Sequence, residues 1–175
     1  MRGSPKGWGE RLALCAGIGW LAVACAVPVS LADGRWRERT GGASIADLAA
    51  LDASWRRAEL AGPLLSFVGP DDARACWIRS CRGAAAPARA EAHALLISLD
   101  EVKVEQEGGV VLAGVESWAL RARAVERGRA VQLAAVTRVA AGCTDDFLLV
   151  TPHDLAAHEP VFERWWASFE PGSRG

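Results

Sequence analysis

Several residue types are scarce in this 175-residue chain, and their scarcity limits the range of functions that the chain can have. Lysine occurs only at Lys6 and Lys103, and tyrosine is absent. Basic and acidic residues nearly balance, at 20 and 21. A nucleic-acid-binding domain carries a strong basic excess on one face. We therefore expect no nucleic-acid partner.

Motifs for catalysis and cofactor binding are also missing. The sequence has no G-x-S-x-G elbow, P-loop, dinucleotide fingerprint or C-x-x-C pair. Its three histidines are scattered, and His93 is expected to lie exposed on a helix. We predict no metal, no cofactor and no catalytic residue.

The N-terminal segment is the most informative part of the sequence. Arg2, Lys6 and Arg11 precede an apolar run over residues 12–29 that contains no charged residue. A basic start followed by an apolar middle and small residues is typical of an export signal. We assign residues 1–32 to this signal.

Three interpretations of the signal stay open. In the first, lipoprotein signal peptidase cleaves after Leu21-Ala22-Val23-Ala24, and Cys25 carries the lipid. Ala26 would then be compatible with sorting to an outer membrane. In the second, an ordinary signal peptidase cleaves after Ala32, where Ser30 and Ala32 are the small residues of the site. In the third, the run remains as a membrane anchor near the lower length limit for a span.

The rest of the chain is long enough for one domain with a real core. We expect residues 33–54 to form a segment of uncertain structure, residues 55–170 a single globular domain, and residues 171–175 a disordered tail. Beyond residue 32 the formal net charge is −3.

Cysteine usage predicts one disulfide. Cys15 and Cys25 fall in the signal, which leaves three cysteines in the domain. Because Cys81 and Cys143 each lie at the end of a strand-like run, we predict that they pair and that Cys76 is a buried thiol. The bridge would stabilise the fold by roughly 4 kcal/mol in the chain-entropy model. The alternative is that all three cysteines are unbridged core residues.

Hydrophobic periodicity predicts an antiparallel sheet with two helices, which is an α+β fold. Strands are expected at residues 35–39, 55–60, 64–68, 73–80, 102–107, 117–126, 130–139 and 146–151. Turns are expected at residues 69–72 and at Gly108-Gly109, and residues 45–51 have helical spacing. The helices are expected at residues 87–99 and 160–169, and the aromatic stripe of the second should be core. A minor alternative makes Trp165-Trp166 a ligand or membrane contact.

The order of these elements resembles that of known proteins. It includes Leu64-Leu65-Ser66-Phe67, a strand ending at Cys81, a Pro-led helix, the Gly142-Cys143-Thr144-Asp145-Asp146-Phe147 segment and a closing Phe162-x-x-Trp165-x-x-Ser168-Phe169. This layout looks like a group of small, mostly uncharacterised bacterial envelope lipoproteins. It is also similar to the PsbP/Mog1-like fold, an antiparallel sheet sandwiched by helices. The resemblance covers roughly residues 55–170. It implies a non-catalytic accessory or binding role and supplies no catalytic residues.

Two functions from different classes remain as hypotheses. The first is an exported binding module of the cell envelope that contacts an envelope protein partner. It would be a periplasmic or outer-membrane lipoprotein held to the membrane if Cys25 is acylated, or else a secreted soluble protein. The second is a small hydrolase or metal-dependent enzyme that uses His153, His158 and Asp146 or Asp145, with Cys143 beside His153 as a further candidate nucleophile. It requires these side chains to converge within hydrogen-bond reach.

Overall fold

The computed structural model describes residues 29–60, 62–81 and 85–172. Cys15, Cys25 and the predicted cleavage position before Cys25 lie outside the described residues. The alternative cleavage position after Ala32 lies within them.

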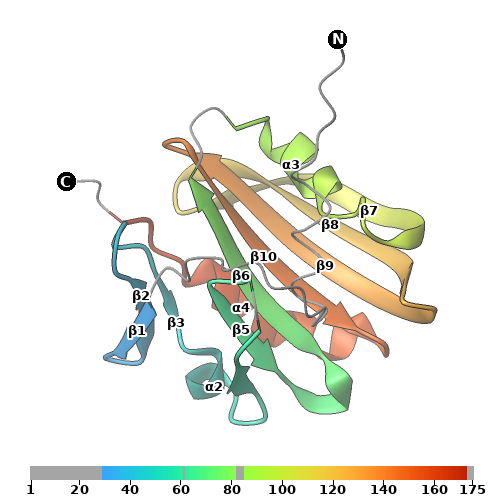
Figure 1. Ribbon diagram of the computed structural model, residues 1–175, viewed down its shortest axis with the longest axis horizontal. Helices are drawn as coiled ribbons and strands as arrows, with labels where there is room; N and C mark the ends of the chain where they lie inside the picture. Colours follow the sequence, from blue (N-terminus) through green and yellow to red (C-terminus); the bar gives the residue numbers. More distant parts are fainter. Residues whose placement is uncertain (1–28, 61, 82–84, 173–175) are drawn as a thin grey trace.

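Seven antiparallel strands of the described chain form the main sheet, in the order β4-β5-β6-β10-β9-β8-β7 (Figure 1). Their bounds are β4 Arg56–Ala58, β5 Leu65–Val68, β6 Arg74–Cys81, β7 Asp100–Leu112, β8 Val115–Glu126, β9 Arg129–Ala140 and β10 Cys143–Thr151. The four strands from β7 to β10 are joined by the two-residue turns Ala113-Gly114, Arg127-Gly128 and Ala141-Gly142, whose residues all have positive φ. Turns of this conformation match the twist of the strands that they connect.

Within the described residues, a smaller sheet and three α-helices complete the fold. The small sheet consists of β1 Val29–Ala32, β2 Arg35–Glu38 and β3 Ser44–Ala46. The α-helices are α2 Leu48–Leu51, α3 Ala88–Ala94 and α4 Glu159–Ala167, and two short 3₁₀ helices are η1 Pro70–Asp72 and η2 Leu155–Ala157. Helix α3 packs on one face of the main sheet, while α4, α2 and the small sheet pack on the other (Figure 1). The α+β class predicted from the sequence is confirmed.

Both faces of the main sheet carry a hydrophobic core. Along β10, Phe147 and Leu149 belong to the cluster on the α4 side, and Leu148 and Val150 belong to the cluster on the α3 side. A strand covered on both faces needs apolar residues in both directions. Because both faces of β10 are covered, every residue of this strand is buried.

Helix α4 contributes to the larger core, as its aromatic stripe predicts. Phe162 and Trp165 are buried, and Trp165 makes edge-to-face contacts with Phe67 and Phe147 at centroid distances of 5.7 and 6.1 Å. The Trp165 Nε1 also donates a hydrogen bond to the Ala46 carbonyl oxygen at 3.0 Å. Helix α4 therefore joins the small sheet to the main one.

Two sequence-based expectations about local structure are wrong. Gly108-Gly109 is not a turn, because it lies within β7, where Gly108 pairs with Ala119 of β8. Residues 45–51 do not form one helix but divide into the end of β3 and α2. The last four residues of the predicted signal, residues 1–32, form β1, which pairs with all four residues of β2. The extent of the signal stays a prediction.

Cys81 and Cys143 form a disulfide, in agreement with the predicted pairing. They lie directly opposite each other on the neighbouring strands β6 and β10. Cys76 is 3 % exposed and is itself disulfide-bonded, so the expectation of a free thiol is wrong.

The start of the predicted C-terminal tail contacts the domain. Gly172 lies so close to the small sheet that a Cβ atom there would fall 1.6 Å from the Gly41 carbonyl oxygen. Residues 173–175 lie outside the described part of the chain. No helix among the described residues is long and apolar enough to cross a membrane.

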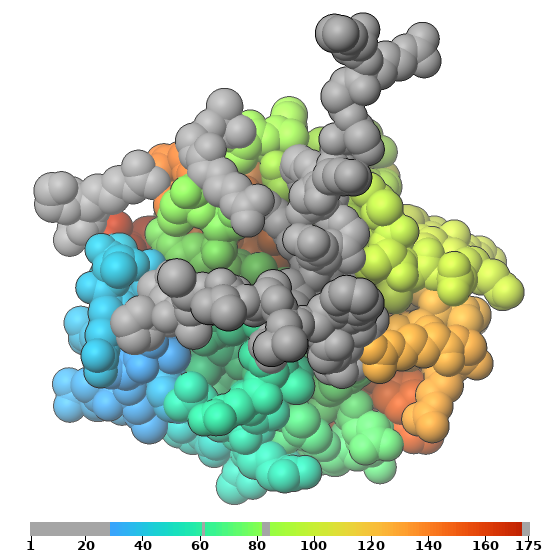
Figure 2. Space-filling view, in the orientation of Figure 1, coloured from blue at the N-terminus to red at the C-terminus, as the bar shows by residue number. Residues whose placement is uncertain are grey.

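The small sheet and strand β7 occupy opposite sides of the molecule. In Figure 2 the small sheet, in blue, lies at the left, and β7, in yellow-green, lies at the right. The two sides of the fold can therefore contact different surroundings.

Candidate functional site

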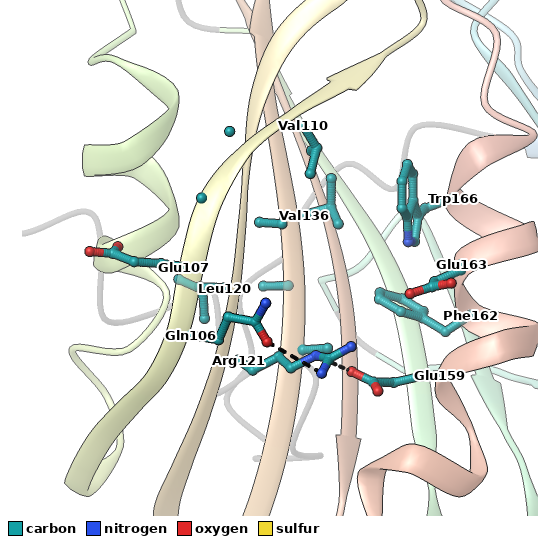
Figure 3. Close-up of a pocket in the computed structure, with 15 residues that line it drawn as sticks. Gln106, Glu107, Val110, Leu120, Arg121, Val136, Glu159, Phe162, Glu163 and Trp166 are labelled. Atoms are coloured by element: carbon teal, nitrogen blue, oxygen red, sulfur yellow. Dashed lines mark hydrogen bonds and ion pairs between the residues drawn. The ribbon is translucent and has the colours of Figure 1, made fainter.

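A groove of about 240 Å³ separates α4 from the strands β7, β8 and β9 (Figure 3). We call it the α4 groove. Its floor includes Gln106, Gly108 and Val110 of β7, Ala119 and Arg121 of β8, and Ala134 and Val136 of β9. Its wall consists of Glu159, Phe162, Glu163 and Trp166 of α4.

The groove exists because Gly108, Ala119 and Ala134 of its floor are small. Gly108 lies opposite Ala119, and Ala134 lies opposite Arg121, in the register of these strands. A Cβ atom added to Gly108 would meet no atom within 4 Å. Glycine and alanine at these positions leave open the space between the outer strands and α4.

One ion pair crosses the groove. The Arg121 Nε lies 2.5 Å from the Glu159 Oε1, and the Arg121 Nη1 donates a hydrogen bond to the Gln106 Oε1 at 3.4 Å (Figure 3). Burial raises the pKa of Glu159, while Arg121 opposes this shift and the neighbouring Glu163 adds to it. The charge of Arg121 is thus balanced within the groove, whereas Glu163 is exposed.

The two adjacent tryptophans of α4 have different surroundings. Trp165 is fully buried in the core, but Trp166 is only half-buried and lines the groove (Figure 3). The sequence alternative that made both of them contact residues is therefore wrong for Trp165. For Trp166 it remains a hypothesis.

A second polar cluster lies on the α3 side of β7. The Glu107 Oε2 is 2.6 Å from the His93 Nε2 and accepts a hydrogen bond from the Trp118 Nε1 at 3.1 Å. The Arg89 Nη2 donates to the Glu107 Oε1 at 2.7 Å. Hydrogen bonds from His93 and then Trp118, together with Arg89, lower the pKa of Glu107 to about 2. His93 is partly exposed, as predicted, but it also ties α3 to β7.

A third cluster consists of buried charges next to the disulfide. The Asp145 Oδ1 accepts hydrogen bonds from the Arg79 Nη1 at 2.9 Å and the Trp77 Nε1 at 3.1 Å. Arg138 approaches the other oxygen of Asp145 at 3.5 Å, and the Arg79 Nε lies 3.2 Å from the Glu38 Oε2. Burial raises the pKa of Asp145, and the two arginines oppose the shift. These ion pairs connect β2 of the small sheet to the main sheet.

The residues of the enzyme hypothesis do not come together. Asp146 is buried on the α3 side, where its Oδ1 accepts a hydrogen bond from Thr137 at 2.8 Å. His158 is buried on the α4 side against Trp55, and His153 is exposed. Asp145 is held in the buried ion pairs.

The structure also places the candidate nucleophile Cys143 and the residues that could bind a metal. Cys143 is bonded to Cys81 and is not available as a nucleophile. Across the described part of the chain, no group of three or more potential ligand residues could hold a metal ion.

Sequence reasoning missed most of the groove. Most of its floor residues are small or aliphatic, and they reach a common site only through the register of three strands. Trp166 was the one signal, because a tryptophan beside a core tryptophan points to a different side of the helix. His93 pairs with Glu107, which is 14 residues away along the chain, and Asp145 pairs with Arg79, which is 66 residues away.

Comparisons with known proteins identify the fold. No protein-family model and no curated protein matches the chain. Among solved structures, the cyanobacterial PsbP protein (CyanoP) of Synechocystis sp. PCC 6803 is similar, with a TM-score of 0.59 and 12% identity over 88% of this chain and 98% of that one.

Two further structures show the same similarity. LpqN of Mycobacterium tuberculosis, described as involved in cell envelope biogenesis, has a TM-score of 0.57 and 16% identity over 75% of this chain and 86% of its own. PA94 of Pseudomonas aeruginosa, a protein of unknown function, has a TM-score of 0.53 and 18% identity over 84% of this chain and 98% of its own. At these identities the comparison establishes the fold, which is PsbP-like, as the element order predicts.

Proposed function

We propose that this protein is a lipid-anchored, non-catalytic binding module of the bacterial cell envelope. Cys25 is the lipid-attachment residue, and the α4 groove is part of the surface that contacts an envelope partner. The proposal joins the export signal of the sequence to the geometry of the folded domain.

The disulfide supports export. Disulfides form and persist in oxidising compartments and are rare in the cytosol. The Cys81–Cys143 bridge joins the central strands β6 and β10, so it belongs to the folded domain itself. A chain that needs this bridge for stability is expected to mature outside the cytoplasm.

The position of β1 carries the proposal that processing occurs at Cys25. Val29 begins β1 and packs against the larger core. Cleavage before Cys25 leaves β1 whole, whereas cleavage after Ala32 removes it and exposes the edge of β2. Of the two cleavage positions, the one before Cys25 preserves every strand of the small sheet.

The groove and the comparisons support a binding role. Binding sites are concave and mostly apolar, with a few placed polar groups. The α4 groove has this character, with Phe162 and Trp166 beside the Arg121–Glu159 pair. LpqN, which has the same fold, is described as involved in cell envelope biogenesis. Its description makes an envelope role a reasonable hypothesis for this chain.

Metabolic labelling with an alkyne fatty acid tests the lipid anchor. The full chain and two variants, Cys25→Ala and Cys15→Ala, are expressed in a bacterial host that acylates lipoproteins. We expect label on the wild type and on Cys15→Ala, because Cys15 lies inside the apolar run, and no label on Cys25→Ala. Equal labelling of all three chains, or labelling of none, would contradict the proposal.

A further inference from the structure

Strand β7 is an edge of the main sheet. Within the described residues it pairs with β8 and with no other strand. An edge strand presents a row of backbone N–H and C=O groups that another chain can pair with, and proteins usually protect such edges with bulges, Lys or Pro.

Only the first half of β7 has this protection. Register irregularities fall between Asp100 and Lys103 and between Val104 and Gln106. From residue 106 to residue 112 the pairing with β8 is regular, and this half contains neither Lys nor Pro. Val111 is 73% exposed there. The second half of β7 is therefore a regular edge that is open to pairing.

The two faces of this half differ in chemistry. Successive residues of a strand point to opposite faces. Val110 packs against the core on the α4 side, so Gly108 also faces the α4 groove, whereas Glu107 contacts His93 of α3, so Gly109 also faces the α3 side. On the α3 side, a Cβ atom at Gly109 would lie 3.9 Å from the Glu116 Oε1. Glu116 is exposed and makes no ion pair within the described chain.

We propose that residues 106–112 of β7 accept an extended segment of the envelope partner as an eighth strand of the sheet. Alternate apolar side chains of that segment enter the α4 groove, and the intervening Lys or Arg side chains face Glu116. This inference rests on the proposed binding function and specifies its partner. Backbone pairing provides affinity, and pockets for alternate side chains provide specificity.

Charge complementarity selects a basic segment. The carboxylates of Glu116 and Glu163 are exposed on the two sides of the edge, and the cation in the groove, Arg121, is already paired with Glu159. A second copy of β7 would be a poor occupant, because residues 106–112 include Glu107 and no basic residue. Like charges directly opposite each other across strands are destabilising.

The size of the groove favours a side chain over a separate ligand. Pockets for drug-sized molecules have volumes of about 300–1,000 Å³. The α4 groove, at about 240 Å³, is smaller and is open beside the strand edge. It is suited to apolar side chains of a chain that is held by backbone hydrogen bonds.

Selection of phage-displayed random 12-residue peptides on the purified protein tests this proposal. We expect enrichment of sequences that alternate apolar and basic residues, with affinities measurable by fluorescence polarisation of the synthetic peptides. Failure to enrich such sequences, or enrichment of acidic ones, would overturn the proposal. The selection does not depend on acylation, so its failure is distinguishable from a failure of the lipid anchor.

Two variants locate the selected peptides. Gly108→Phe fills the groove and should exclude the apolar side chains of the peptide. Glu116→Lys reverses the charge on the other face and should repel the basic side chains. Each variant should weaken binding about tenfold or more, because a steric or like-charge conflict at an interface is costly. The matched controls are Gly108→Ala, which leaves most of the groove open, and Glu59→Lys, an exposed charge reversal beyond β4 at the opposite edge. Unchanged affinity in Gly108→Phe and Glu116→Lys would place the peptides elsewhere and overturn the assignment.

Discussion

Charged side chains occupy two kinds of environment in this protein. Asp145 is fully buried and is surrounded by Arg79, Arg138 and the Trp77 indole. Glu107 lies at the surface, yet three side chains bond its carboxylate. The first arrangement avoids an uncompensated buried charge. The second attaches α3 to the edge strand.

Glu107 should make stability depend on pH in the acid range. Its folded-state pKa of about 2 lies below the ordinary value of 4.5. The carboxylate therefore contributes stability that is fully present above pH 4.5 and is lost as the pH falls towards 2. We expect Glu107→Gln to lower the free energy of unfolding above pH 4.5 and to match the wild type near pH 2, as measured by urea unfolding.

The control for this experiment is Glu105→Gln on the same strand. Glu105 forms an ion pair with Arg123 only, among the contacts of the described residues, at 2.9 Å. We expect Glu105→Gln to lower the free energy of unfolding less than Glu107→Gln does. A constant difference between Glu107→Gln and the wild type from pH 2 to pH 6 would contradict the role given to Glu107.

The adjacent tryptophans of α4 should respond differently to truncation. Trp165 is fully buried, so Trp165→Ala should reduce the free energy of unfolding by about 3–5 kcal/mol. Trp166 lines the groove and is half-buried, so Trp166→Ala should cost less than about 1 kcal/mol. Chemical denaturation of the two variants checks this prediction. Equal losses would show that Trp166 is a core residue.

At the scale of elements, the alternation of apolar and polar residues, together with the residues typical of turns, made most strands predictable. Residues 130–139 alternate in part in the sequence, with Gln132 and Arg138 between apolar residues, and they correspond to β9, Arg129–Ala140. The helix predicted at residues 87–99 begins as expected after Pro87, but α3 ends at Ala94 and turns follow it. The apolar stripe of a short helix shows reliably which side of the helix is buried. It is a poorer guide to the residue at which the helix ends.

Two local signals misled the sequence interpretation. A Gly-Gly pair between apolar runs is typical of a turn, but the turn after β7 is Ala113-Gly114, which supplies the two positive φ angles. Val29–Ala32 continues the apolar run of the signal, and its pairing with β2 is visible only in three dimensions. The groove was missed for the same reason, because the strand register assembles it from small residues.

The disulfide should be a major stabilising link between β6 and β10. It joins residues that are 62 positions apart. In the chain-entropy model, a loop of this length corresponds to about 4 kcal/mol of stabilisation. We expect the double variant Cys81→Ser with Cys143→Ser to lose about that much in urea unfolding without reductant, with Ser80→Ala as the control. A loss below about 1 kcal/mol would contradict this contribution.

At the scale of the whole molecule, the small sheet and the proposed binding edge of β7 lie on opposite sides. Cys25 is four residues before β1, so an extended connection spans at most about 14 Å. The small sheet that contains β1 lies opposite β7 (Figures 1 and 2). If Cys25 is acylated as proposed, the small sheet would lie near the membrane, and the proposed binding edge of β7 would face away from it.

Polar contacts of two arginines join the small sheet to the main sheet and to α4. Arg79 of β6 bonds both Glu38 of β2 and Asp145 of β10. Arg35 of β2 donates a hydrogen bond from Nη2 to the Ser168 carbonyl oxygen after α4 at 2.7 Å. The small sheet is thus bonded to the main sheet and to α4, which form the groove.

Intact mass spectrometry of the protein purified from a bacterial envelope fraction tests the central claim most directly. We expect the mass of a chain that begins at Cys25 with added acyl groups, and the loss of that species in Cys25→Ala. A mass that corresponds to an unmodified chain beginning at Asp33 would contradict the account, because the protein would then be released without its anchor and without β1.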